Sequence, residues 1–317
     1  MTCRICGNAE GNALYRAREM MLGTREEFTY FQCRQCLCLQ IETIPADLAK
    51  YYPTDYNGFA APRRAVYEGV KGFVRKARYA AALFPNSAFA GLLNSLMQAE
   101  QYEILGHVGV RTDSRILDVG CGQGSYLYPL YELGMKNVQG VDPFIPDSLL
   151  YPNGYKVEKK FLEDVSGQWD VLIFNHSYEH VPDPLATLQA AARLLADQGT
   201  CLIRIPTVSS YAWEHYRTDW FQLDAPRHLY LHSVESMTLL AGQAGLKLID
   251  VRYDSDSAQF VHSEKYKRNI AMYEDASALY SSKVDRKLKK MAYQRQAEKL
   301  NQEKKGDQAA FILQKQP

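Results

Sequence analysis

The middle of the chain, from residue 106 to residue 261, alternates between two hydrophobic patterns. Short continuous apolar runs rich in Val, Ile and Leu are separated by segments in which apolar residues recur at every third or fourth position. The first pattern is typical of strands buried on both faces, and the second of helices that cover them. The alternation predicts an α/β fold with a seven-stranded, mostly parallel sheet. The expected strands are residues 115–119, 138–142, 155–161, 169–174, 200–205, 246–253 and 309–315.

Helical spacing is expected in residues 65–106 (broken at Pro85), 120–133, 183–196 and 234–244. Residues 262–305 are strongly charged and also have a helical pattern. Because Gly306 and Asp307 form a turn and an apolar run follows them, we interpret this segment as a helical insertion before the last strand. A helical tail with no returning strand is the alternative.

The charges of the chain nearly cancel. Lysine and arginine number 37, aspartate and glutamate 36, and 46% of the 317 residues are hydrophobic. This composition excludes a largely disordered chain and gives no strong global field for nucleic acid, so we expect no nucleic-acid partner. It leaves the oligomeric state open.

Neither a secretory signal nor an uninterrupted apolar run of about 18 residues is present, so a cytoplasmic protein is expected. A basic stretch, residues 63–78, leads into an apolar one, residues 79–84. This arrangement suggests peripheral contact with a membrane, but burial of the apolar face against the core is the favoured interpretation.

The seven cysteines are unevenly placed. Cys3 and Cys6 form one CxxC pair, and Cys33 and Cys36 form another. Two such pairs supply four thiolates from two tight turns, which suits a tetrahedral zinc site with no open position, so the expected zinc is structural. Reduced thiols without metal are the alternative, and Cys38 is a neighbour rather than a ligand.

These features divide the chain into four expected parts. They are a zinc-binding module (1–45), an aromatic linker with helices (46–105), an α/β core (106–261 and 306–317), and the helical insertion (262–305).

A glycine-rich turn follows the first core strand. Its sequence, Asp118-Val119-Gly120-Cys121-Gly122-Gln123-Gly124, lets the backbone approach a ligand closely. No GxxxxGK[ST] motif is present, and the spacing differs from the dinucleotide GxGxxG. Asp142 ends the second core strand, where a carboxylate can accept the two hydroxyls of a ribose.

Several motifs together resemble those of class I methyltransferases that depend on S-adenosylmethionine. ILDVGCGQGSYL resembles their first motif, VDP at 141–143 their ribose-binding position, and WDVLIFNHSYEHVPDPLATL their fourth strand and following helix. LDAPRHLYLHS at 223–233 and the two CxxC pairs resemble a group with an N-terminal zinc-knuckle module, associated with sugar, glycan and natural-product pathways.

The resemblance implies a Rossmann-like sheet, S-adenosylmethionine as cofactor, and a sugar, nucleotide-sugar or glycan intermediate as acceptor. The cofactor-binding residues that it implies are Asp118, Gly120, Gly122, Gly124, Asp142 and Asn175. Related sugar C-methyltransferases carry Glu-His where this chain has Arg227-His228, which puts their C-methylation mechanism in doubt. We therefore expect O-methylation, with C-methylation, or methylation of RNA or protein, as alternatives.

A hydroxyl acceptor needs a base, and histidine has a suitable pKa. His176, His180 and His228 are expected at the carboxyl edge of the sheet, where open α/β folds place their ligands. With Glu179 they are the predicted catalytic residues. Alternatively, Glu179 and His180 cap a helix or anchor their loop, and His228 shapes its own loop.

Other side chains are expected near this edge, and some of them have two interpretations. Arg227 either binds an acceptor phosphate or carboxylate or pairs with Asp224, and Arg204 is expected to form a structural ion pair. Tyr51, Tyr52 and Tyr56 either form a roof over the site or pack the module against the core. The adenine is expected near residues 161–164.

Overall fold

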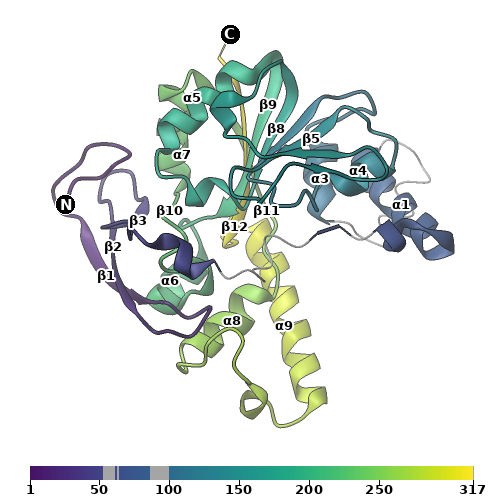
Figure 1. Ribbon diagram of the computed structural model, residues 1–317. Coiled ribbons are helices and arrows are strands. Elements are labelled where there is room, and N and C mark those ends of the chain that lie inside the picture. Colours follow the sequence, from purple (N-terminus) through teal and green to yellow (C-terminus); the bar gives the residue numbers. More distant parts are fainter. Residues whose placement is uncertain (53–60, 63, 86–99, 317) are drawn as a thin grey trace.

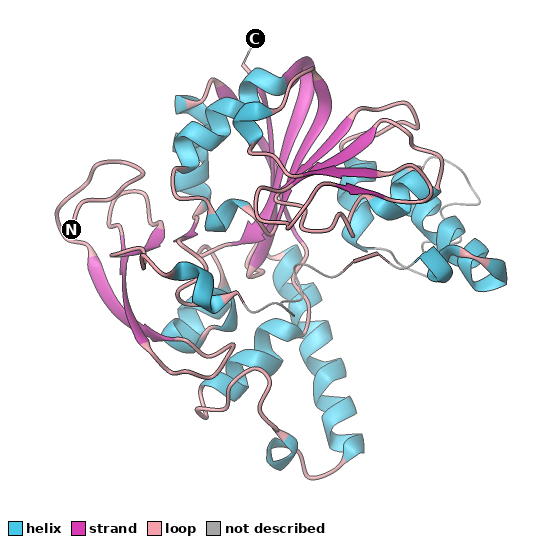
Figure 2. Ribbon diagram, in the orientation of Figure 1, coloured by secondary structure: helices cyan, strands magenta, loops and turns pink. Residues whose placement is uncertain are grey.

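The computed structural model describes residues 1–52, 61–62, 64–85 and 100–316. A large twisted sheet forms the centre of the molecule, a smaller sheet lies at the N-terminal side, and a helical arm projects from the opposite end to the C-terminus (Figure 1). Figure 2 shows that helices cover the large sheet on both faces.

The large sheet has the strand order β11-β12-β9-β8-β4-β5-β7-β6. The five strands from β9 to β7 pair in parallel, whereas β12 is antiparallel to both of its neighbours. The predicted mostly parallel α/β sheet is therefore confirmed. Its strands are β4 (Ile116–Val119), β5 (Val138–Val141), β6 (Leu149–Leu150), β7 (Lys156–Glu158), β8 (Trp169–Asn175), β9 (Leu195–Pro206), β11 (Leu246–Tyr253) and β12 (Gln308–Lys315).

Two details of the prediction are wrong. The sheet has eight strands rather than seven, because β6 pairs antiparallel with β7 at its edge, and two residues are too few to leave a period in the sequence. The helix expected over 120–133 is reduced to α4 (Tyr128–Glu132), since the glycines before it adopt positive φ values that a helix does not allow.

The other α-helices lie on two sides of the sheet or beyond its ends. The helices α5 and α7 contact each other and lie on one side of the sheet, and α1, α3 and α4 lie on the other (Figure 1). Their bounds are α1 (Gly69–Leu83), α3 (Glu100–His107), α5 (Pro184–Leu194), α6 (Tyr211–Tyr216), α7 (Val234–Gln243), α8 (Ala258–Tyr266) and α9 (Lys283–Gln302).

The strand β8 shows how the two cores are divided. Leu172 and Phe174 belong to the cluster that includes α5 and α7, while Val171 and Ile173 belong to the cluster under α1, α3 and α4. Alternate side chains of a strand point to opposite faces, so one continuous apolar run supplies both cores. The apolar face around Leu83 is buried in the second cluster, as the sequence favoured.

The N-terminal sheet has the order β1-β2-β3-β10, with β1 (Ala13–Arg18), β2 (Glu27–Gln32), β3 (Leu39–Ile41) and β10 (Tyr230–Leu231). Its fourth strand comes from the loop region after β9. Tyr230 and Leu231 pair with Gln40 and Leu39, so the module is completed by a segment almost 200 residues away. The module and the core therefore share one hydrogen-bonded sheet.

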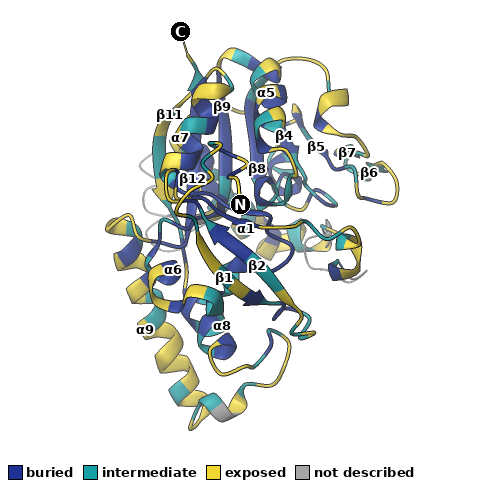
Figure 3. Ribbon diagram, turned by 90° about the vertical axis from the view of Figure 1, so that its left-hand side faces the viewer, coloured by how far each residue is buried: buried dark blue, intermediate teal, exposed yellow. Residues whose placement is uncertain are grey.

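The segment between β11 and β12 forms the arm that projects from the molecule. It contains α8 and α9, and α9 is largely exposed apart from Ala297 and Leu300 (Figure 3). In the described part of the chain, no helix is both long and apolar enough to cross a bilayer.

Candidate cofactor and acceptor site

The turn after β4 is shaped by close packing against the loop after β8. Gly120 has a φ of 70°, and a Cβ there would lie 2.5 Å from the Cβ of Ser177. Ser177 also donates a hydrogen bond from its hydroxyl to the carbonyl of Val119, at 2.6 Å. Glycine is needed at this position for both its backbone angle and its size.

Asp142, which follows β5, holds the glycine turn of the predicted cofactor site in place. The carboxylate is buried and accepts hydrogen bonds from the backbone N–H groups of Gly122 and Phe144, both at 2.8 Å. These bonds order the glycine turn against the end of β5 and leave further lone pairs on the oxygens. Gly124, in contrast, packs against Val157 and Tyr155, where a Cβ would not fit.

Asp118 lies beneath the same turn. Its side chain is 1% exposed, and its Oδ1 has no hydrogen-bond partner among the described residues. Burial, and then the charge of Asp142, raises the pKa of Asp118 well above its ordinary value. A buried carboxyl oxygen without a donor fits a ligand that brings a donor or a positive charge, as S-adenosylmethionine does.

The end of β8 is tied to the end of β9. The guanidinium of Arg204 donates to Asn175 Oδ1 at 3.1 Å and to His176 Nε2 at 2.9 Å, and it forms an ion pair with Asp254. The pairing expected of Arg204 is therefore present, and it joins Asn175 and His176. His176 has a φ of 54°, a left-handed backbone rare outside glycine that marks a functional or strained position.

The four predicted catalytic residues lie together. Glu179 is fully buried, with Oε1 3.7 Å from His176 Nδ1 and 3.8 Å from His228 Nε2. The ring centroids of His180 and His228 are 4.9 Å apart. Although burial opposes ionisation, the three histidines lower the pKa of Glu179 to about 2, whereas burial lowers the pKa of His180.

Backbone carbonyls hold two of these rings. His228 Nδ1 lies 2.7 Å from the carbonyl of Gln222, and His180 Nδ1 lies 2.8 Å from that of Arg227. Tyr52 lies with its hydroxyl 3.1 Å from the same nitrogen of His180.

Arg227 is a structural residue in this arrangement. Its side chain is fully buried and forms ion pairs with Asp224 and, at 3.1 Å, with Glu19 of the module. It also donates to the carbonyl of Tyr51 at 3.2 Å. The structure therefore favours the alternative in which Arg227 pairs with Asp224, because the side chain is fully buried and makes four hydrogen bonds within the fold.

The roof predicted from the tyrosines is only partly described. Tyr51 is buried in the module, against Phe28, so it packs the module rather than covering the edge of the sheet. Tyr52 contacts His180, and Tyr56 lies outside the described residues. The expected adenine loop, residues 161–164, contains a short 3₁₀ helix, and Phe161 is exposed.

A cavity of about 570 Å³ opens beside Arg204. Its walls come from the ends of β9 and β11, the start of β12, α1, α3, and the loop before His228. Arg78 Nε and Gln259 Oε1 are buried without a described partner. The side chains that give the cavity its polar character include Arg78, Gln222, Asp254, Gln259 and Asp307. Asp254, Gln259 and Asp307 were not predicted from the sequence, because residues 254–259 and 307–308 lie far apart in the chain and share no motif.

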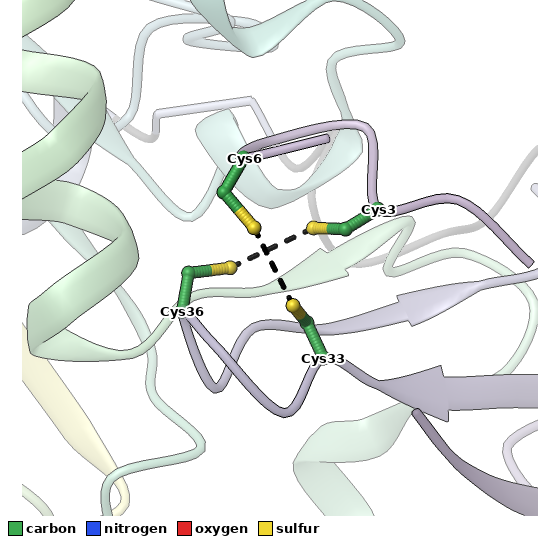
Figure 4. A group of neighbouring side chains, drawn as sticks. All are labelled: Cys3, Cys6, Cys33 and Cys36. Carbon is green, nitrogen blue, oxygen red and sulfur yellow. Dashed lines mark hydrogen bonds between the residues drawn. The ribbon is translucent and has the colours of Figure 1, made fainter. Parts of the chain in front are cut away.

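The four predicted metal-ligating cysteines, from the segment before β1 and the turn between β2 and β3, point toward one another (Figure 4). Cys3 Sγ lies 3.6 Å from Cys36 Sγ, and Cys6 Sγ lies 3.5 Å from Cys33 Sγ. Thiolates around a tetrahedral zinc ion, with bonds of about 2.3 Å, lie about 3.7 Å apart. The side-chain amide of Gln40 donates to Cys3 Sγ at 3.1 Å, which favours the thiolate. The cluster fits a closed four-thiolate site, and Cys38 lies outside it.

The mainly parallel α/β sheet, with a glycine turn and an acidic residue at its carboxyl edge, defines the class of protein as an α/β enzyme. The chain matches the methyltransferase-domain family over residues 88–251, and it belongs to that family. It is an S-adenosylmethionine-dependent methyltransferase, as the resemblance implied.

Two curated relatives show the extent of the similarity. The chain is 30% identical over 185 residues to the ubiquinone biosynthesis O-methyltransferase of Bordetella avium, covering 51% of this chain and 74% of that one. It is 31% identical over 104 residues to the enzyme of that name from Psychrobacter cryohalolentis, and there spans only 39% of the relative.

Two solved structures overlap with part of the chain. A mycolic acid cyclopropane synthase complexed with SAH is 19% identical, with a TM-score of 0.44, covering 70% of this chain and 85% of that one. A possible histamine N-methyltransferase from Thermotoga maritima is 16% identical, with a TM-score of 0.42, covering 69% and 88%. The family assignment rests on the sequence matches.

Proposed function

We propose that this enzyme transfers a methyl group from S-adenosylmethionine to a hydroxyl of a sugar, nucleotide-sugar or cell-surface glycan intermediate. The observation that carries the proposal is the polar cavity beside Arg204. Its walls present carboxylates, amides and guanidinium groups, together with the rings of Tyr79 and Phe221. Planar polar groups that exchange hydrogen bonds with neighbouring hydroxyls, beside an aromatic ring, suit a sugar-like acceptor.

The cofactor supplies an activated methyl group, and the chain positions both reactants. Asp142 and the glycine turn would hold the nucleoside. The unpartnered Oδ1 of Asp118 would accept a hydrogen bond from the cofactor's amino group, either directly or through a bridging water molecule. Arg204 would fix the loop of His176 at the wall of the cavity. Holding the acceptor oxygen within about 3 Å of the methyl carbon supplies much of the rate enhancement.

The acceptor proton is assigned to the cluster of Glu179, His176, His180 and His228. The cluster lies directly beyond Arg204, and the buried carboxylate of Glu179 would stabilise an imidazolium formed next to it. The surroundings of the cluster thus support a neutral imidazole that becomes positively charged when it takes the proton of the acceptor hydroxyl.

Two other acceptors remain as alternatives. The name of the Bordetella avium relative suggests a ubiquinone precursor, but an apolar acceptor would leave the charged groups of the cavity unpaired. C-methylation next to a ketone would use the same cluster, and nuclear magnetic resonance of the product would separate it from O-methylation.

We also propose that the four cysteines hold a structural zinc ion. The sulfur separations and the hydrogen bond from Gln40 support a four-thiolate site, which leaves no open position for chemistry. The zinc would then stabilise the N-terminal module. Because β10 pairs with β3 of the module, the zinc would also help to position the loop that carries His228.

The test uses methyl-labelled S-adenosylmethionine in a host-cell extract with the purified protein. We expect label in small polar or lipid-linked sugar molecules, reduced at least 100-fold by His228→Ala. His215→Ala, an exposed histidine outside the cluster, is the matched control and should retain full transfer. Label mainly in RNA, protein or an apolar quinone fraction would contradict the proposed acceptor class.

A further inference from the structure

Three potential metal ligands meet behind the wall of the cavity. A carboxylate oxygen of Glu179 and one ring nitrogen each of His180 and His228 all lie within 4.8 Å of one another. They come from the loop after β8 and from the loop before β10. Two histidines and one carboxylate are a ligand set that first-row divalent metals accept, with coordination positions left over.

The tautomers of the two histidines direct lone pairs toward the cluster. A backbone carbonyl can only accept, so His228 Nδ1 must carry the hydrogen that it shares with Gln222, at 2.7 Å. The same argument applies to His180 Nδ1 and the carbonyl of Arg227, at 2.8 Å. Neutral rings held in this way present Nε2 as a bare acceptor, which is the usual second-shell arrangement of metal-binding histidines.

The hydrogen-bond acceptor atoms of the cluster face one another, and no hydrogen-bond donor lies between them among the described residues. His228 Nε2 is 3.8 Å from Glu179 Oε1 and also 3.8 Å from Asp224 Oδ2. Neither oxygen of Glu179 has a hydrogen-bond partner among the described residues, although the side chain is fully buried. These separations are too long for hydrogen bonds of an imidazolium. Two ligands of one cation, with bonds of about 2.0–2.2 Å, lie about 3–3.5 Å apart, so a bound ion would draw these groups a few tenths of an ångström closer together.

The buried charges around the cluster do not balance. Beside the cluster, the guanidinium of Arg227 pairs with the carboxylates of Glu19 and Asp224. Glu179 is thus left without an arginine or lysine in any described ion pair. A buried carboxylate in this position needs a positive charge nearby, and a divalent cation would supply it.

We propose that Glu179, His180 and His228 bind one divalent transition-metal ion, with coordination positions left over for an acceptor oxygen. The inference rests on the proposed function for its purpose, because an acceptor oxygen on the cation would lose its proton more easily. It leaves His176, which is 36% exposed and bonded to Arg204, as the histidine of the cluster outside the ligand set.

Manganese binding to the zinc-loaded 317-residue chain tests the site without substrate. Mn²⁺ accepts imidazole and carboxylate ligands and competes poorly for four thiolates. Calorimetric titration should give one Mn²⁺ per chain, and Glu179→Gln and His228→Gln should each weaken binding at least tenfold. Glu214→Gln and His215→Gln, both exposed, are the matched controls and should bind as the wild type does.

Cobalt gives a readout that needs no variant. Co²⁺ added to the zinc-loaded wild type should show the weak visible bands of nitrogen and oxygen ligands, without thiolate charge transfer. Absence of Mn²⁺ binding, equal binding by both cluster variants, or a purely thiolate cobalt spectrum would overturn the site.

The outcome is separable from that of the proposed function. Methyl transfer that persists after chelation, in protein that binds no Mn²⁺, would remove the metal site and leave the function standing. Tight Mn²⁺ binding without methyl transfer to any polar acceptor would keep the metal site and remove the proposed function.

Discussion

The molecule brings together two groups of potential metal ligands, and they differ in how the chain assembles them. The four cysteines come from two tight turns within residues 3–36, and every ligand is a thiol. Glu179, His180 and His228 come from two loops of the core, and their backbone and carboxylate neighbours are as important as the ligands themselves. A local motif suffices for the first group, whereas the second exists only after the sheet has formed.

The two groups are nevertheless mechanically connected. Tyr30 of β2 donates from its hydroxyl to the carbonyl of His228 at 2.8 Å, and Ser233 donates to the carbonyl of Cys36 at 2.6 Å. Arg227 joins Glu19 of the module to Asp224. The loop that carries His228 is thus held from the side of the cysteines, so the comparison predicts that damage to the module reaches the cluster.

The largest effect is expected from loss of the cysteine site. Cys33→Ser should abolish zinc binding, because a structural zinc ion contributes about 10 kcal/mol or more to a folded site. Methyl transfer should then fall at least 100-fold, since the loop around His228 loses its support. Metal analysis, thermal unfolding and a transfer assay measure these changes. Cys38→Ser, a buried neighbour outside the four-cysteine group, is the control and should keep its zinc. Full activity without zinc would break the connection between the two groups.

The next largest effect is expected from substitution of Arg227, the buried arginine that links the N-terminal module to the core. Arg227→Met should lower the free energy of unfolding by about 3–5 kcal/mol, because it leaves Glu19 and Asp224 buried without their partner. Chemical denaturation measures the change. Combining Arg227→Met with Glu19→Gln should restore part of the loss, because one of the unpaired charges is then removed. An additive double variant would show that the ion pair does not couple module and core.

The same comparison explains what could be predicted from the sequence. The sheet and the cysteine cluster follow from short-range patterns: period, strand length and CxxC spacing. The pairing of β10 with β3, the burial of Arg227 and the cavity residues Asp254 and Asp307 depend on segments far apart in the chain. No local pattern encodes such contacts.

The glycine turn shows that even a recognised motif does not reveal all of its local structure from the sequence. Its spacing predicted close backbone approach, but the expected helix after it largely failed to form. Gly120, Gly122 and Gly124 all have positive φ values, and apolar periodicity does not report this backbone feature. The place of Gly124 against Val157 depends on packing between β7 and the turn, which the sequence alone did not reveal.

A smaller effect is expected at the turn itself. Gly120→Ala forces a Cβ to within 2.5 Å of Ser177 and strains a φ of 70°, which costs about 1–2 kcal/mol. We expect S-adenosylmethionine to bind about tenfold more weakly, as measured by calorimetry. Gly242→Ala, where a Cβ meets no atom within 4 Å, is the matched control. Unchanged affinity in Gly120→Ala would mean that the cofactor does not depend on this turn. Mn²⁺ binding should not change, which would separate the cofactor site from the cluster.

The smallest effect concerns Asp307 at the cavity wall. Burial raises the pKa of Asp307 to about 7, although Trp220 donates to it at 2.9 Å. Between about pH 4 and pH 7 the folded chain keeps a proton that the unfolded chain has lost, so this group lowers stability as the pH rises, and the penalty is complete above pH 7. Asp307→Asn stays neutral at every pH and can still accept from Trp220. Its stability relative to the wild type should therefore be higher at pH 8 than at pH 5, by about 1 kcal/mol or more. Denaturation at both pH values, with the exposed Asp113→Asn as control, measures the difference. A relative stability that does not change with pH would show that Asp307 carries no unfavourable buried charge, so that it would resemble Glu179, whose charge the neighbouring histidines favour.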